Sequence, residues 1–194
     1  MPNVYKVMLT LTNHIRPNAF IIGLLFGLLI TTQTSPANND GFSLTVSHRD
    51  NTYHTMISTV INKPPSVLFT LLTSYNRLNH YSRLIQESRL LANGNLLLKI
   101  KACFAFICFN KRQVMKLNVS SLNITATVIP EQSDFKSGQL QWRITKRNKN
   151  SYIEFSSTMT PKFWIPPLIG PLFIKQKLRE EALYSIKQIE KGQL

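Results

Sequence analysis

The sequence is poor in the residues and motifs from which catalytic centres are usually built. Only nine of its 194 residues are acidic and four are histidines, and they are scattered along the chain. No nucleophile elbow, zinc-protease helix, P-loop or dinucleotide-binding fingerprint occurs. The two cysteines form no cluster with histidines, which argues against a zinc site. We therefore predict no catalytic residue, no metal ligand and no cofactor.

The sequence also lacks an apolar run long enough for an ordinary membrane span. The run from Ala19 to Ile30 has twelve apolar or glycine residues. As a helix it would cover about 18 Å of a hydrocarbon core roughly 30 Å thick. Basic residues precede it, and Ser35 and Ala37 follow in the spacing that signal peptidase prefers. Residues 1–37 are thus expected to be a secretory signal leading to the periplasm; the alternative is an anchor that holds the protein to the inner membrane by residues 19–30.

Acidic residues are few relative to basic ones. The chain has 23 lysines and arginines, and cleavage after Ala37 would remove two of these and no acid, leaving a net charge of +12. Such a charge favours anionic partners, whether lipid headgroups or nucleic acid. Because export argues against nucleic acid, an anionic membrane surface is the expected partner. A basic surface that serves only solubility is the alternative.

Cys103 and Cys108 are the only cysteines. In a straight strand their Cα atoms would lie roughly 16 Å apart, whereas a disulfide needs them within about 7 Å. A disulfide therefore requires a sharp bend through residues 104–107, which an oxidising compartment makes worth considering. A disulfide at such a bend and a pair of buried thiols both stay open.

Alternating apolar and polar residues predict that most of the remaining chain is strand. The first strands are expected near residues 42–48 and 53–61, followed by short helices near residues 65–73 and from Asn76 to Ile85. A run of about five or six antiparallel strands then extends from Gln86 to Thr160. Strands grouped together with helices at the ends indicate an α+β fold rather than an alternating α/β fold.

Turn residues divide the long run of strands. Asn93-Gly94 is a strong hairpin signal because both residues tolerate positive φ. Asn110-Lys111-Arg112 predicts another turn, and residues 130–138 predict a polar loop. A stiff loop with Phe163, Trp164 and Ile165 among several prolines closes the run.

A long amphipathic helix is expected from about residue 170 to residue 190. Its apolar side chains fall within an arc of about 140°, and they are Leu178, Ala182, Leu183, Ile186 and Ile189. Lys175 and Arg179 fall in the same arc. Either their stems extend to water or their charges pair with an acid, or the charges meet the polar end of a ligand beneath the helix.

This order of elements resembles the START-like helix-grip (SRPBCC) superfamily, and within it the polyketide cyclase/dehydrase branch that includes coenzyme Q-binding proteins. The matching segments are VINKPPSVLFTLLTSYNRLNHYSRLIQESRLL (Val60 to Leu91), QLQWRIT (Gln139 to Thr145) and TPKFWIPPLIGP (Thr160 to Pro171). The resemblance implies one domain over residues 41–191. In it, a curved antiparallel sheet of about six or seven strands wraps around the C-terminal helix, with two short helices after the first strands.

The resemblance further implies an apolar site between sheet and helix for a lipid, a quinone or a polyketide-like molecule. The expected function is an exported, non-enzymatic binding or carrier protein. The residues expected at the site are Tyr81, Leu98, Leu117, Trp142, Phe155, Phe163, Trp164, Leu178, Arg179 and Leu183. Phe163 to Ile165 are expected to enter a membrane while Lys162, Lys175 and Lys177 meet headgroups.

Two other functions fit the same fold, because a fold does not specify an activity. One is a cyclase/dehydrase-type enzyme whose cavity orients a substrate through Tyr81, Trp142, Arg143 and Arg179. The other is a protein-interaction module at the membrane, in which the loop around Trp164 docks on a partner.

Overall fold

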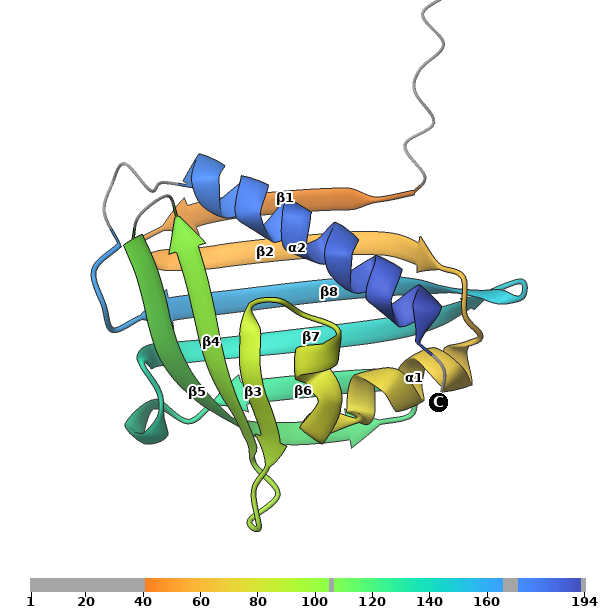
Figure 1. Ribbon diagram of the computed structural model, residues 1–194, viewed down its shortest axis with the longest axis horizontal. Coiled ribbons are helices and arrows are strands. Elements are labelled where there is room, and N and C mark those ends of the chain that lie inside the picture. The colour runs from red at the N-terminus through yellow and green to blue at the C-terminus, as the bar shows by residue number, and fades with distance from the viewer. Residues whose placement is uncertain (1–40, 105–106, 166–170, 193–194) are drawn as a thin grey trace, which may run out of the picture. The chain divides into compact units, whose positions relative to one another are not determined.

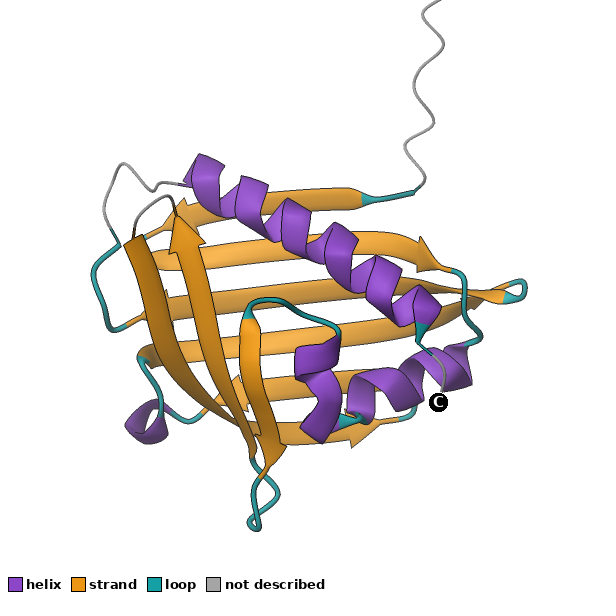
Figure 2. Ribbon diagram, viewed as in Figure 1, coloured by secondary structure: helices purple, strands orange, loops and turns teal. Residues whose placement is uncertain are grey.

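The computed structural model describes residues 41–104, 107–165 and 171–192, and the predicted signal segment lies outside this part of the chain. An antiparallel sheet and a long C-terminal helix dominate the described domain (Figures 1 and 2). In chain order the elements are β1 (Ser43–Arg49), β2 (Thr52–Ile61), α1 (Pro65–Thr73), η1 (Tyr75–His80), β3 (Ile85–Leu90), β4 (Leu96–Phe104), β5 (Ile107–Ser120), β6 (Asn123–Val128), η2 (Pro130–Gln132), β7 (Phe135–Arg147), β8 (Asn150–Pro161) and α2 (Pro171–Lys191).

The sheet has eight strands in the order β1-β2-β8-β7-β6-β5-β4-β3, and all neighbours are antiparallel. Only β2 and β8 pair without being consecutive, because α1 and η1 carry the chain from β2 to the opposite edge, where β3 begins. The predicted α+β helix-grip fold is confirmed. The strand count is slightly higher than the six or seven that the resemblance implies.

The helices cover one face of the curved sheet. In Figure 1, β3, β4 and β5 run steeply across the direction of β1, β2 and β8, and α2 lies diagonally over the face that this curvature encloses. None of the helices in the described part of the chain is both long and apolar enough to cross a membrane.

A packed core fills the end of this space where α2 finishes. Pro65 is the first residue of α1, a position at which the backbone N–H that proline lacks would have no acceptor within the helix. Leu68 and Leu71 of α1 are 0% and 2% exposed, and they share a cluster with Ile144, Ile153 and other apolar residues. Burying each such side chain contributes roughly 1.5–3 kcal/mol. This cluster holds α1 and the end of α2 on the sheet.

The turn predicted at Asn110-Lys111-Arg112 is wrong, because β5 runs without interruption from Ile107 to Ser120. Its hairpin with β4 is closed earlier, by a disulfide between the cross-strand partners Cys103 and Cys108, whose Cα atoms lie 4.0 Å apart. Of the two alternatives for the cysteines, the structure has the disulfide. Polar composition is a poor guide here, because these residues lie within a paired strand: Lys111 pairs with Ile100.

Candidate functional site

A cavity of about 420 Å³ lies between the inner face of the sheet and the first half of α2. Its walls are the inward-facing residues of several strands, since alternate residues of a strand face the same side. Most of them are apolar: Leu78, Leu84, Ile85, Leu96, Leu98, Ile100, Ala102, Phe109, Met115, Phe135, Leu140, Trp142, Phe155, Met159, Pro161, Phe163, Ile165, Ile174 and Leu178. A volume of this size is within the range of small-molecule sites.

The polar groups of the cavity are Tyr53, Thr55, Ser82, Lys111, Gln113 and Ser157. Burial raises the pKa of the Tyr53 hydroxyl above its ordinary value. No carboxylate and no imidazole lines the cavity within the described residues. His48, His54 and His80 are all exposed, and the described residues contain no cluster of potential metal ligands.

Lys111 and Gln113 also line the cavity, but they are not among the site residues predicted from the sequence. They occupy consecutive inward positions of β5, between the cavity residues Phe109 and Met115. The Lys111 ammonium lies 4.2 Å from the centre of the Phe163 ring. Gln113 is 3% exposed, and its amide nitrogen lies 3.7 Å from the sulfur of Met159. Alternate residues of a strand face the same side. Counting back from Met115 by two residues at a time therefore identifies both Gln113 and Lys111 as inward-facing.

Five of the predicted site residues come together at the cavity: Leu98, Trp142, Phe155, Phe163 and Leu178. Trp142 and Phe155 are cross-strand partners with ring centroids 5.0 Å apart, and they form part of the cavity floor. Phe163 follows β8 and packs its ring edge-to-face against Phe135 at 5.6 Å. Their role in ligand binding remains a prediction.

The other five do not line this cavity. Tyr81 belongs to the packed cluster beside α1, and Leu117 packs against the inner residues of β4 to β6. Trp164 is 73% exposed and Leu183 is 46% exposed. Arg179 is exposed, with its guanidinium 5.4 Å from the Phe42 ring.

The rotation of α2 explains these differences. The side that faces the sheet carries Ile174, Leu178, Glu181 and Ile189, whereas Lys175, Arg179 and Leu183 are exposed. The expectation that Lys175 and Arg179 lie in the buried arc is therefore wrong. An apolar arc read from sequence assumes that every buried position is apolar, and Glu181, only 6% exposed, breaks that assumption.

Glu181 joins α2 to the segment between η1 and β3. Its Oε1 accepts hydrogen bonds from the Ser82 hydroxyl at 2.6 Å and from the Arg83 and Leu84 backbone N–H groups at 2.6 and 3.3 Å. Its Oε2 accepts from the Arg83 guanidinium at 3.3 Å. Because Ser82 and Leu84 line the cavity, these bonds position one of its walls.

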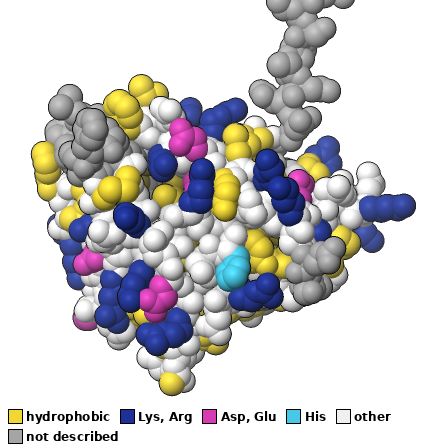
Figure 3. Space-filling view, viewed as in Figure 1, with side chains coloured by type: hydrophobic (Ala, Val, Ile, Leu, Met, Phe, Trp, Pro, Cys, Tyr) yellow, Lys and Arg dark blue, Asp and Glu magenta, His cyan; other side chains and the backbone are white. Residues whose placement is uncertain are grey.

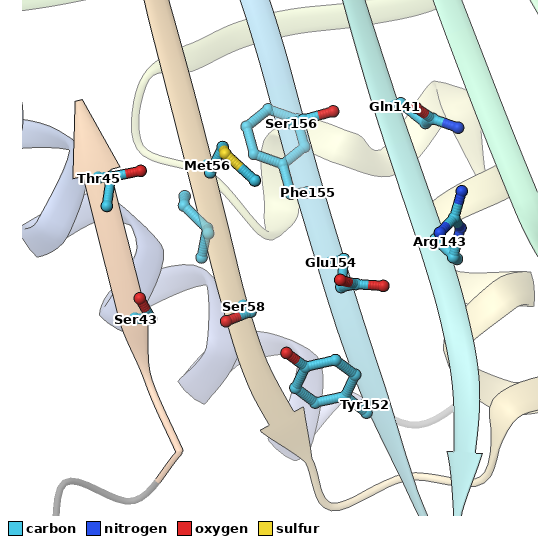
Figure 4. A pocket seen from close by; sticks show the side chains of 11 residues that line it. Ser43, Thr45, Met56, Ser58, Gln141, Arg143, Tyr152, Glu154, Phe155 and Ser156 are labelled. Atoms are coloured by element: carbon cyan, nitrogen blue, oxygen red, sulfur yellow. The ribbon is translucent and has the colours of Figure 1, made fainter. Parts of the chain in front are cut away.

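A second hollow, of about 320 Å³, lies on the other face of the sheet. Figure 4 shows its side chains on β1, β2, β8 and β7, with the helices behind the sheet. Most of its lining residues are polar, among them Ser58, Gln141, Arg143, Glu154 and Ser156. Arg143, considered above for an enzyme site, therefore lies away from the apolar cavity.

Comparisons with known proteins agree with this architecture. A family model described as "Polyketide cyclase / dehydrase and lipid transport" matches residues 61–182, more than half of the chain. No curated protein sequence matches.

Solved structures share the fold at low sequence identity. A STAR-related lipid transfer protein from Xanthomonas axonopodis has a TM-score of 0.57 at 11% identity, over 77% of this chain and 99% of that one. A START superfamily protein from Mycobacterium smegmatis has a TM-score of 0.56 at 13% identity, over 71% and 94%. An aromatase/cyclase from a Streptomyces species has a TM-score of 0.55 at 8% identity, over 72% and 92%. With its curved sheet, covering helix and matching family model, this chain belongs to the polyketide cyclase/dehydrase and lipid transport family and has its START-like fold.

Proposed function

We propose that this protein is an exported, non-enzymatic carrier that holds an apolar small molecule, of the lipid, quinone or polyketide class, between its sheet and α2. The observation that carries the proposal is the cavity of about 420 Å³ with its predominantly apolar lining. Each methylene group that moves there from water gains roughly 0.8 kcal/mol. The family description includes lipid transport, and the Xanthomonas neighbour is titled a lipid transfer protein.

The character of the polar groups favours a carrier over an enzyme. The described cavity lining contains no carboxylate or imidazole to act as a general base. The cyclase/dehydrase alternative loses Arg143 and Arg179, which lie outside the cavity.

Export is supported by two independent features. The first is the basic, apolar and small-residue pattern of residues 1–37. The second is the disulfide between Cys103 and Cys108, a bond that persists in oxidising compartments such as the periplasm.

A membrane surface is the proposed place of ligand exchange. Trp164, Leu172 and Phe173 are 73%, 76% and 54% exposed, and they are close in sequence to the cavity residues Ile165 and Ile174. Figure 3 shows hydrophobic side chains at the surface where α2 begins, with lysine and arginine side chains across the same face. Apolar groups beside positive charge are typical of proteins that bind anionic bilayers.

The three lysines expected to contact headgroups differ in whether they already bind another group of the protein. Lys162 donates hydrogen bonds to the carbonyl oxygens of Pro130 and Ser133, and Lys177 pairs with Glu180 at 3.6 Å. Lys175 is exposed, and no ion pair holds it within the described residues. Of the three, Lys175 is the one we propose for headgroup contact.

Two adjacent serines of β8 give a matched test of the cavity. Ser157 lines the cavity, and Ser156 lines the hollow on the other face. The full chain, purified and analysed by solvent extraction with mass spectrometry, should yield a bound apolar molecule. Ser157→Phe should lose that molecule because the ring fills the cavity, while Ser156→Phe should retain it. A wild-type protein with no extractable ligand, or equal retention by both variants, would contradict the proposal.

Membrane docking is tested through Trp164. The chain has two tryptophans, so Trp142→Phe leaves Trp164 as the single tryptophan, whose emission can be excited selectively. Vesicles with phosphatidylglycerol should shift its emission to the blue and expose it to lipid-attached bromine quenchers, whereas pure phosphatidylcholine vesicles should not. Emission that stays unchanged with anionic vesicles would rule out this docking mode.

A further inference from the structure

We infer that the carried molecule is an acidic amphiphile, whose anionic group pairs with Lys111 while its apolar body fills the rest of the cavity. This inference rests on the proposed carrier function and specifies the ligand class. It begins from the position of Lys111, which β5 places in the inward row with Phe109, Gln113 and Met115. Lys111 is the one charged residue among the described residues that line the cavity.

Among the described residues, no acidic side chain pairs with the Lys111 ammonium. Its close contact is the face of the Phe163 ring, at 4.2 Å from the centroid. Lys111 is half-buried, and a cation–π contact of this kind is worth roughly 0.5–2 kcal/mol.

Gln113 adds a second polar group on the same side of the cavity. It is the next inward residue of β5, roughly 6–7 Å along the strand from Lys111. Its side chain is almost fully buried, and its amide nitrogen donates to the sulfur of Met159, a weak acceptor, at 3.7 Å. A carboxylate or phosphate between the two side chains would accept from both the ammonium and the amide.

The remaining lining suits the apolar body of such a ligand. Phe109 and Phe135 both pack against Phe163, whose ring Lys111 contacts, with centroid distances of 6.0 and 5.6 Å to Phe163. Beyond them the cavity continues along Leu98 and Trp142. A volume of about 420 Å³ lies at the lower end of the range for ligand sites, which favours one apolar chain or ring system over a two-chain phospholipid.

The experiment compares acidic and neutral probes that share an apolar chain. The full-length protein is titrated with a pyrene-labelled fatty acid, with its methyl ester, and with the corresponding alkyl phosphate. The wild type should bind an acidic probe at least about tenfold more tightly than the ester, since hydrogen bonds to charged groups are the strong ones. The fatty acid and phosphate arms show which anionic group the site prefers.

Three variants locate the effect. Lys111→Met should weaken binding of the acidic probe and so abolish the preference for it over the ester, whereas Lys111→Arg should keep the preference. Lys116→Met is the matched control, because Lys116 is an exposed residue of the same strand and its loss changes the net charge equally. This control separates a local contact from the attraction of a basic protein for anions.

The possible failures are distinguishable. If the wild type binds ester and acid equally, or if Lys111→Met keeps the preference, the acidic-ligand inference is overturned and the carrier function stands. If neither probe binds the wild type, both are overturned. Circular dichroism of each variant identifies loss of fold, and ester binding by Lys111→Met gives a second check that its cavity is intact.

Discussion

Replacing Glu181 by alanine should destabilise the protein far more than the same change at its neighbour Glu180. Glu181 is 6% exposed and accepts hydrogen bonds from the Ser82 hydroxyl, two backbone N–H groups and the Arg83 guanidinium. Its removal leaves buried donors without an acceptor, at a cost of roughly 1–3 kcal/mol each for groups fully removed from water. Since Arg83 is half exposed and can turn to solvent, we expect a total loss of about 3 kcal/mol.

Urea unfolding followed by circular dichroism measures this loss as a shift of the transition midpoint at constant slope. Glu180→Ala is the control: its side chain is 48% exposed and forms a surface ion pair with Lys177, a contact worth about 0–1 kcal/mol. Glu181→Gln keeps one acceptor oxygen and should fall between the two. If Glu181→Ala and Glu180→Ala unfold at the same urea concentration within error, then the hydrogen bonds from residues 82–84 do not hold α2 on the sheet.

Three further predictions concern stability. Burial raises the pKa of the Tyr75 hydroxyl, which has no hydrogen-bond partner in the described structure. Tyr75→Phe should therefore raise the free energy of unfolding by about 1 kcal/mol, seen as a higher Tm. Replacing both Cys103 and Cys108 by serine, which opens a loop with a sequence separation of five, should cost about 2 kcal/mol by loop entropy; a variant that unfolds at the same denaturant concentration as the oxidised wild type would contradict this. A hydrogen bond from Lys99 holds the pKa of Glu87 below its ordinary value. The contribution of this hydrogen bond to folding stability is complete above the ordinary pKa of the carboxyl group. It is lost as the pH falls through the lowered pKa of the folded state. Wild-type Tm should thus fall slightly more on acidification than that of Glu87→Gln, and identical pH profiles would refute it.

Much of the fold was predictable because it depends on local periodicity. Alternation along β7 and β8 placed Trp142 and Phe155 on the inner face, and the register pairs them directly. Residues 65–73 were predicted as a short helix and form α1. Both features follow from a period that a few neighbouring residues define.

The site was less predictable, because its polar members depend on long-range contacts. Asn110, Lys111 and Arg112 have turn-like composition, but the hairpin closed by the disulfide at Cys103 and Cys108 places them within a paired strand. Lys111 consequently lines the cavity, where composition alone would not put a lysine.

The sequence by itself determined the order of strands and helices, the α+β class and the apolar inner face, since these follow from local patterns of side chains. Only the tertiary structure decided how α2 is rotated on that face, because the buried carboxylate of Glu181 satisfies donors from a segment almost a hundred residues away. The tertiary structure also decided that the space under α2 is packed with side chains at one end and leaves a cavity at the other. Leu68 and Leu71 pack one end, whereas the side chains at the other end do not meet and leave a cavity.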